Sequence, residues 1–462
     1  AHEIKQNKRR ETIIENKDKA IISKKLVTLK KDVPVKEKIE EFRFKQIDKD
    51  KLYKHLRDME FNRLLSSVIS MYGEPSLSNK KMDLVQKEEQ ISINKKNYYL
   101  IKNEKEIDKW IEEAEEFGEL AIDTETSSLD AHQADLIGVS LSTKTGKACY
   151  IPIGHKSENC LDKEAVLKKL KPLLEDKSVK KIGQNIKFDF IVLYNHGIKM
   201  NSMEDTMLMS YVLDAGKNRH NMDTLSEIHL NHKTISFKDL VGSGKKEINF
   251  SEVELNQAME YAAEDADITY RLYKIFNKNL KLEKLTNIYE IFEKPLIEIL
   301  AFMEINGIKI DSKFLKDLSL KFEKKIKNLE KEIFRLSKKE FNIGSPKQLG
   351  EIIYNELKIA VLKKTRKGSF ATSASVLEDL AFKGHKFPKL ILDWRQVSKL
   401  KNTYSDSLRE HINTNTKRVH TSFLLAATTT GRLASSNPNL QNIPIKSEDG
   451  KEIRKAFIAE KG

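Results

Sequence analysis

The chain has 462 residues, 39% of them hydrophobic and 33% charged, with a formal net charge of +14. This length suits about three domains, and the surplus of Lys and Arg favours a polyanionic partner, nucleic acid before membrane, with a Lys-rich coding bias as the alternative source of the charge. Two cysteines exclude a disulfide framework, and without a signal peptide or an apolar run of about 20 residues we expect a cytoplasmic protein that does not enter a membrane.

The N-terminal part is charged and patterned for helices. Lys51–Tyr72 has apolar residues at helical spacing and is predicted to form one helix, which Gly73 ends. Residues 76–95 are polar and are predicted to be a linker. We therefore expect two small N-terminal segments, 1–50 and 51–95.

From residue 96 the pattern changes to short apolar runs that alternate with helical stretches, and helices dominate up to residue 282. This alternation predicts a mixed sheet surrounded by helices, an α/β domain over 96–284. The expected strands are 98–101, 120–124, 136–142, 147–153 and 179–184, and the expected helices include 104–117, 163–174 and 186–196.

Residues 285–405 are predicted to be almost wholly helical. Asp311 and Ser345 are good helix caps, and apolar residues spaced by three and four after Asp311 predict a helix seam, so we expect an antiparallel helical arm. Its outward face is basic, which is either a solvated surface or a grip on phosphates. The seam residues are Phe322, Ile326, Leu329, Ile333 and Leu336, and the basic residues are Lys321, Lys324, Lys325, Lys327, Lys331, Lys338 and Lys339.

Residues 406–462 contain an alternating pattern at Arg418–Leu424, which predicts one strand. An unusual polar loop, TTTGRLASSNPNLQNIP, follows at 428–444. We expect this segment to form the beginning of a further domain.

Two carboxylates lie at the end of the strand predicted at 120–124. Asp123 and Glu125 are two positions apart, so in a strand their side chains point to the same side. Like charges at this range disfavour ionisation unless a cation lies between them, and hard oxygen ligands suit Mg²⁺ or Mn²⁺. Taken alone, D-x-E is common, and a solvated strand end is its ordinary interpretation.

Two later stretches add acids and a phenol. Asp189 lies one turn into the helix after the strand at 179–184, and Tyr261 and Asp265 are four positions apart on one helix face. Asp267 points away from that face and is predicted to be structural. With the first pair, these residues supply four carboxylates and a phenol, an inventory that fits a two-metal phosphoryl-transfer site.

The stretches DTET, NIKFD and YAAEDAD resemble the three exonuclease motifs of the DEDDy class, as found in the 3′–5′ proofreading domain of the bacterial DNA polymerase I family (family A). A Tyr four residues before the last Asp corresponds to the Tyr subclass. The resemblance implies a ribonuclease-H-like fold for the α/β domain. It also implies hydrolysis of the terminal phosphodiester by water, leaving a 3′-hydroxyl and a nucleoside monophosphate.

The same resemblance implies roles for the acids. Asp123, Glu125 and Asp265 would hold the cation that activates water, and Asp123 and Asp189 would serve a second cation, Asp189 through a water molecule. Tyr261, with Glu125, would orient the attacking water. The implied cofactors are two divalent ions, Mg²⁺ or Mn²⁺.

The resemblance extends over nearly the whole chain. It implies that 1–50 is the tail of a 5′-nuclease domain, that 285–405 is the polymerase thumb along the primer–template minor groove, and that 406–462 is the start of the palm. The residues implied to hold a frayed 3′ end are Leu129, Gln184, Asn185 and Phe237, with a core role as the alternative for Leu129 and Phe237. Those implied to contact the duplex are Arg432, Asn439, Gln441, Asn442 and Lys446.

In this family Lys446 corresponds to an Arg, so a bidentate phosphate contact is lost there. The palm's metal-binding aspartates would follow residue 462 and the 5′-nuclease acids would precede residue 1. We therefore expect a fragment of a DNA polymerase I, with one complete active site, that functions in DNA replication and repair.

The expected partners are single-stranded 3′ ends and primer–template DNA, and the expected state is a monomer near the bacterial nucleoid. Two alternatives stay open: an exonuclease acting on RNA, which would not need the arm or the polar loop, and a non-catalytic primer–template-binding module. His220, His229 and His232 are expected to be helix-end and surface residues and not metal ligands.

Overall fold

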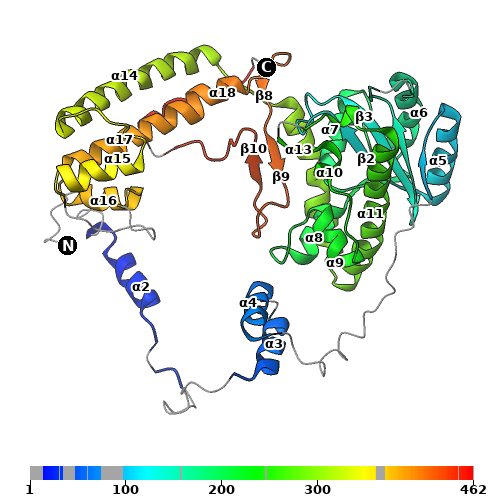
Figure 1. The fold of residues 1–462 in the computed structure, drawn as a ribbon, viewed down its shortest axis with the longest axis horizontal. Coiled ribbons are helices and arrows are strands. Elements are labelled where there is room, and N and C mark those ends of the chain that lie inside the picture. The colour runs from blue at the N-terminus through cyan, green and yellow to red at the C-terminus, as the bar shows by residue number, and fades with distance from the viewer. Residues whose placement is uncertain are drawn as a thin grey trace. The chain divides into compact units, whose positions relative to one another are not determined.

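The computed structural model describes residues 14–30, 32–34, 47–59, 61–73, 97–156, 159–244, 247–359, 370–445 and 447–460 (Figure 1). The chain divides into two compact units, Ala1–Lys87 and Glu88–Gly462. The linker predicted at 76–95 and the predicted DNA contact Lys446 lie outside the described residues.

The first unit contains helices, but the prediction of a single helix over residues 51–72 is wrong. The chain forms α3 (Lys49–Asp58) and α4 (Asn62–Tyr72), which pack against each other. Met59 leaves the helical conformation, and the Tyr53 hydroxyl donates to the Gly73 carbonyl oxygen at 2.6 Å. Folding back buries part of the apolar face, whereas one long helix would leave that face in water. The preceding helix is α2 (Lys17–Val27), which has no buried residue.

The second unit is built around a six-stranded mixed sheet with the order β1-β4-β3-β2-β5-β6. Strand β3 is antiparallel to β2 and β4, and the pairs β1–β4, β2–β5 and β5–β6 are parallel. The predicted α/β class is confirmed, and β6 was missed because only one of its three residues is apolar. The strands are β1 (Tyr98–Leu100), β2 (Glu119–Thr126), β3 (Leu136–Lys144), β4 (Lys147–Pro152), β5 (Lys180–Gly183) and β6 (Met203–Asp205).

Helix α11 (Leu255–Leu282) packs across β1 to β5. Ala148 of β4 lies against Ala263 and Ala266, so small side chains let this helix come close to the sheet. Helix α5 (Glu104–Phe117) packs against β2 and β3. The remaining helices before α11 are α6 (Lys163–Glu175), α7 (Lys187–Asn195), α8 (Thr206–Asp214), α9 (Met222–Leu230) and α10 (Phe237–Val241).

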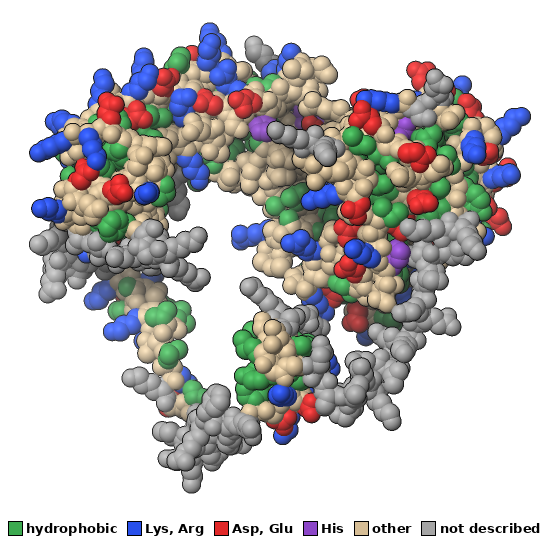
Figure 2. All heavy atoms as spheres, viewed as in Figure 1, with side chains coloured by type: hydrophobic (Ala, Val, Ile, Leu, Met, Phe, Trp, Pro, Cys, Tyr) green, Lys and Arg blue, Asp and Glu red, His purple; other side chains and the backbone are tan. Residues whose placement is uncertain are grey.

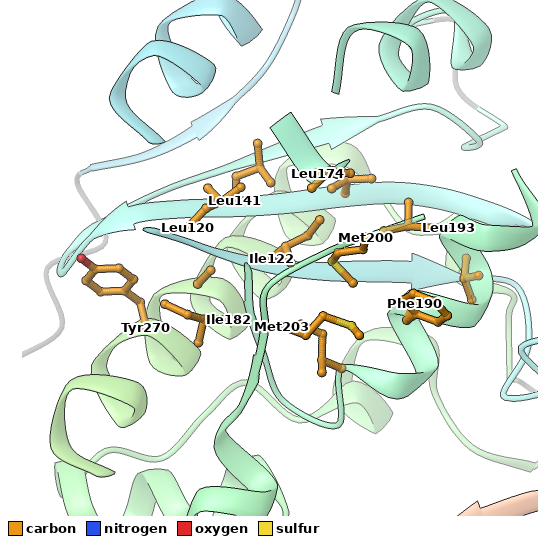
Figure 3. Close-up of a cluster of buried hydrophobic side chains, with 14 of the residues drawn as sticks. Leu120, Ile122, Leu141, Leu174, Ile182, Phe190, Leu193, Met200, Met203 and Tyr270 are labelled. Atoms are coloured by element: carbon orange, nitrogen blue, oxygen red, sulfur yellow. The ribbon is translucent and has the colours of Figure 1, made fainter. Parts of the chain in front are cut away.

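The largest apolar core joins the sheet to the helices that carry the sequence motifs. Side chains of the central strands and of α7 belong to the same buried cluster, so β2 and α7 are held in a fixed relation to each other. Figure 3 shows Leu120, Ile122, Leu141, Ile182, Phe190, Leu193 and Met203 in this cluster.

A helical arm follows α13 (Lys294–Asn306), but its pairing differs from the prediction. Helix α14 (Ser312–Ser337) begins at Asp311, as predicted, and its antiparallel partner is α17 (Lys386–Leu400). The indole of Trp394 donates to Glu330 at 3.0 Å. The helix that Ser345 caps, α15 (Pro346–Glu351), is short and continues directly into a π-helical turn, whose residues Ile352, Ile353 and Tyr354 are buried in the cluster at the arm's tip.

The basic residues predicted along α14 are exposed, and Figure 2 shows Lys and Arg side chains gathered along the outer edge of the arm. The other helical elements of this region are α12 (Thr286–Ile288), α16 (Ala374–Phe382), α18 (Ser407–Glu410) and three π-helical turns, Tyr289–Glu293, Ile352–Glu356 and Lys401–Asp406. Within the described part of the chain, no helix combines the length and apolarity that crossing a membrane requires.

The single strand predicted at 418–424 is two strands in two small sheets. β8 (Arg418–Val419) pairs with β7 (Ile308–Lys309), and β9 (Ser422–Leu424) pairs with β10 (Ala434–Ser436). The two residues between these strands contact other segments through their side chains: a ring nitrogen of His420 lies 2.7 Å from the Glu304 carbonyl oxygen, and the Thr421 hydroxyl lies 2.7 Å from that of Ser435. The last helix is α19 (Glu448–Arg454).

Candidate active site

The predicted acid pair lies on β2, on the side of the sheet that α11 covers. Alternation along β2 turns Leu120 and Ile122 to one side and Asp123 and Glu125 to the other. Asp123 is half-buried and Glu125 is buried. The strand therefore delivers both carboxylates to the interface between sheet and helix.

Helix α11 brings Asp265 to the same place. Single carboxylate oxygens of Asp123, Glu125 and Asp265 all lie within 4.8 Å of one another. Tyr261, one turn earlier, hydrogen-bonds the Asp265 carboxylate. By contrast, Asp267 accepts hydrogen bonds from Arg271 at 3.0 Å, from the Tyr98 hydroxyl at 2.9 Å and from the Gly146 N–H at 2.7 Å, all of them structural contacts.

Asp189 stands beside this cluster and is held by Thr124, a residue that the sequence analysis missed. The β5 strand pairs with β2 only up to Ala121, so the Thr124 N–H beyond it has no strand partner on that edge. Asp189 fills the gap: its Oδ1 accepts from the Thr124 N–H at 2.9 Å and from the Thr124 hydroxyl at 2.5 Å. The end of β5 thus determines where the second acidic motif lies.

The electrostatics of the cluster disfavour ionisation of all its carboxylates. Burial raises the pKa of Asp123, and the nearby Asp265 raises it further; burial and then the charges of Asp123, Asp265 and Asp189 raise the pKa of Glu125. Burial raises the pKa of Asp265 to about 8, against the opposing effect of the Tyr261 hydrogen bond. Glu125 Oε1 is buried and has no hydrogen-bond partner among the described residues. Crowded oxygens and an unpartnered one fit a hard divalent cation, which would reverse these shifts.

The second motif is fixed by a buried acid that the sequence analysis also missed. Asp205, at the end of β6, accepts backbone N–H bonds from Asn185 (3.0 Å) and Ile186 (3.1 Å) and from two residues at the start of α8. Asn185 has a positive φ of 61°, an uncommon conformation that these bonds support. Its side chain is exposed, whereas Gln184 bonds Thr206 at 2.5 Å and the His220 carbonyl at 2.8 Å.

The two apolar residues predicted at the 3′ end are both accessible. Leu129 is 96% exposed and Phe237 44%, so the alternative that they are core residues is wrong. Phe237 stacks on Phe250 with ring centroids 6.1 Å apart and lies 6.0 Å from Tyr261. One exposed aromatic side chain, Phe237, therefore lies beside Tyr261.

The residues predicted to contact duplex DNA lie in two places. Arg432 is in the loop between β9 and β10, and the others follow β10. Arg432, Asn439 and Gln441 are exposed. Asn442 is exposed too, but its backbone and side-chain oxygens accept from Tyr404 at 2.6 and 3.2 Å. No contact joins these residues to the acid cluster in the described structure, so they belong to a separate surface.

The three histidines do not form a common site in the described structure. His220 bonds Ser210 at 2.9 Å, His232 bonds Glu264 at 3.0 Å, and His229 packs on Phe276. Through its other oxygen Glu264 also accepts from the Ile235 N–H at 2.7 Å, which fixes the loop leading to Phe237.

Comparison with known proteins identifies two families along the chain. Residues 98–281 match the family model described as 3′-5′ exonuclease, and residues 312–462 match the one described as DNA polymerase family A. A solved structure of the polymerase domain of a DNA polymerase from M. smegmatis, in complex with DNA primer-template and dNTP, is similar with a TM-score of 0.65 and 26% identity, over 78% of this chain and 58% of that one.

Curated proteins named DNA polymerase I are similar over nearly the full chain. The one from Rhizobium leguminosarum is 40% identical over 100% of this chain and 53% of its own length, and the one from Pseudomonas aeruginosa is 40% identical over 97% and 49%. The chain spans about half the length of these relatives. It belongs to the DNA polymerase I family, the family A DNA polymerases, and carries that family's 3′–5′ exonuclease domain ahead of a polymerase segment.

Proposed function

We propose that the chain is a 3′–5′ exonuclease that removes nucleotides from single-stranded DNA 3′ ends, and that this activity proofreads a DNA polymerase I acting in replication and repair. The observation that carries the proposal is the buried cluster of Asp123, Glu125 and Asp265 with its unpartnered oxygen. Two divalent ions, Mg²⁺ or Mn²⁺, would supply an activated water and neutralise charge on the reacting phosphate.

Each acidic side chain of the site, and Tyr261, has its own role in the proposed reaction. Asp123, Glu125 and Asp265 would offer the oxygens for the first ion, and Asp123 with Asp189, which Thr124 fixes, would serve the second. Tyr261, anchored on Asp265, orients the attacking water together with Glu125. Burial keeps competing water away and strengthens each electrostatic interaction.

The neighbouring surface would receive the substrate strand. Leu129 and Phe237 are exposed apolar side chains that can wedge or stack against unpaired bases, which bind aromatic faces with little sequence preference. Gln184 and Asn185 would hold the terminal nucleotides. We assign residues 96–284 to this exonuclease domain.

The remaining segments would bind duplex DNA. Residues 285–405 form the thumb and 406–462 the start of the palm, with Arg432, Asn439, Gln441, Asn442 and Lys446 as contacts; 1–50 and 51–95 are a nuclease-domain tail and a connector. The family and the net charge of +14 support a DNA partner. A monomer in the cytoplasm, close to the nucleoid, is the setting that we propose.

A test with paired substrates separates this function from its alternatives. The proposal predicts that 5′-labelled single-stranded DNA is shortened stepwise in Mg²⁺, faster than RNA of the same sequence, with release of nucleoside monophosphates. Faster loss of RNA would favour an RNA exonuclease. Tight primer–template binding in Ca²⁺ without cleavage of any strand in Mg²⁺ would favour a binding module.

Replacing Tyr261 by Phe tests the water-orienting role. The variant loses the hydrogen bond to Asp265, and we expect kcat on single-stranded DNA to fall by about 10- to 100-fold, the range for partners of metal ligands. Single-turnover kinetics measures the change. Tyr354→Phe, which loses a hydrogen bond in the arm, is the control and should keep parental kcat; an equal fall in both variants would refute the role.

Replacing Arg432 by Ala tests the duplex-binding surface. We expect the Kd for primer–template to rise about 10- to 100-fold, as for loss of a groove-reading Arg, with the rate on single strands unchanged. Fluorescence anisotropy in Ca²⁺ measures binding. Arg57→Ala removes an equal charge from α3 and should leave the Kd near the parental value; loss of both activities in Arg432→Ala would mean that Arg432 is structural.

A further inference from the structure

A buried ion pair joins the second acidic motif to α13, the helix that leads from the exonuclease domain into the polymerase segment. Lys187, the first residue of α7, donates through Nζ to Glu304 near the end of α13. Their side chains are only 6% and 3% exposed. Asp189 lies two residues after Lys187, so the pair holds the same end of the helix that carries this acid.

Glu304 also holds a strand of the polymerase segment. The same oxygen, Oε1, accepts from the Phe423 N–H of β9 at 2.6 Å, and the Glu304 carbonyl oxygen lies 2.7 Å from a ring nitrogen of His420. Arg418 donates to the Asn306 carbonyl oxygen at 2.6 Å. The end of α13 is therefore where α7 and β8–β9 are attached to each other.

A pocket of about 350 Å³ lies at this junction and is lined by both parts. Leu129 and Asn185, two of the residues proposed at the 3′ end, line it together with Lys187, Glu304 and Phe423. The ion pair is thus part of the pocket wall next to the proposed substrate surface. An apolar pair there would pack as well but would not fix the orientation of α7 relative to α13.

We propose that Lys187 and Glu304 are positioning residues of the exonuclease site: beside the bonds of Thr124 and Asp205, the pair sets α7, and with it Asp189, against β9, so that the contact with the polymerase segment contributes to the placement of the acid. The line of contacts runs from the Phe423 N–H through Glu304 and Lys187 to α7, and from Asp189 through Thr124 to β2. Buried hydrogen-bonded charges have few alternative arrangements, which suits them to hold one geometry.

The test is a comparison of Lys187→Met with Lys187→Met/Glu304→Gln in the full chain. The single variant leaves a buried carboxylate without its cation, whereas the double variant is neutral and its Gln oxygen still accepts from Phe423. Mn²⁺ binding without DNA, measured by electron paramagnetic resonance, is the main readout, followed by Tm and by kcat and KM on single-stranded DNA.

We expect the Kd for Mn²⁺ to rise about 10-fold or more in both variants, with kcat reduced and KM near parental, because supporting residues affect metal affinity on this scale. The Tm should fall in the single variant and recover in the double. Parental Mn²⁺ binding in the single variant, or recovery of Mn²⁺ binding together with Tm in the double, would overturn the proposal. If the single variant does not fold, the Kd of the double variant for Mn²⁺ tests the proposal by itself.

Lys147→Met is the matched control, since it removes the partly buried pair with Glu113 on the α5 side of the sheet and should leave Mn²⁺ binding unchanged. The inference rests on the proposed exonuclease function only for its kinetic readout. A parent chain that binds Mn²⁺ but cuts no DNA would contradict the proposed function, and the Mn²⁺ comparison would still test the ion pair.

Discussion

Replacing Asp123 by Ala is expected to lower the exonuclease rate at least about 10³-fold, the upper range for removing one preorganised electrostatic group from a reaction site. Asp123 is the one acid to which the proposal gives both cations, and it lies within 4.8 Å of Glu125 and Asp265. The same change should raise the Tm in EDTA, because burial and Asp265 raise the pKa of Asp123 and removing the acid relieves that repulsion.

The two effects together make the test specific. Mn²⁺ should raise the Tm of the parent but not that of Asp123→Ala, since binding to the folded state stabilises it. Glu164→Ala, an exposed acid in the first turn of α6, is the control and should match the parent in rate and in both Tm values. An Asp123→Ala chain whose Tm in EDTA lies below the assay temperature would show that its inactivity comes from unfolding.

Of the substitutions proposed for this chain, Asp205→Ala should lower the free energy of unfolding the most. Asp205 is fully buried and accepts from four backbone N–H groups, those of Asn185, Ile186, Met207 and Leu208. Burial raises its pKa to about 6, so it is ionised at neutral pH. Losing a helix cap and leaving buried donors unpaired costs about 3–5 kcal/mol, which corresponds to a Tm lower by about 10 °C.

Asp205→Ala should also reduce exonuclease activity in the folded protein, because Asn185 and the start of α7 depend on the same bonds. Differential scanning calorimetry and single-strand assays well below the Tm measure the two effects. Asp162→Ala, which removes one exposed cap bond (2.8 Å) from α6, is the control and should lower the Tm far less. Equal Tm losses would mean that Asp205 is only a helix cap.

The local part of the fold and site was predictable from the sequence. The strand period places Asp123 and Glu125 on one side, and the helix period places Tyr261 one turn before Asp265; both rest on spacing alone. Between and beside them, the small residues Ala263 and Ala266 pack against β4.

Contacts between distant segments were not predictable. Thr124 holds Asp189 because β5 stops pairing at Ala121, a matter of register that no local pattern reveals. The Lys187–Glu304 pair joins residues 117 positions apart. The alternation at 418–424 indicated one strand, but its two ends pair with different partners, β7 and β10, which lie far from each other in the sequence.

The most direct test of the central claim is degradation of 5′-labelled single-stranded DNA in Mg²⁺ by the parent chain beside Asp123→Ala, with dNTPs in a parallel lane. The account predicts a ladder shortened from the 3′ end with the parent and an intact strand with the variant, with and without dNTPs. Equal ladders from both proteins, or no degradation by a parent chain that binds Mn²⁺ and DNA, would contradict it.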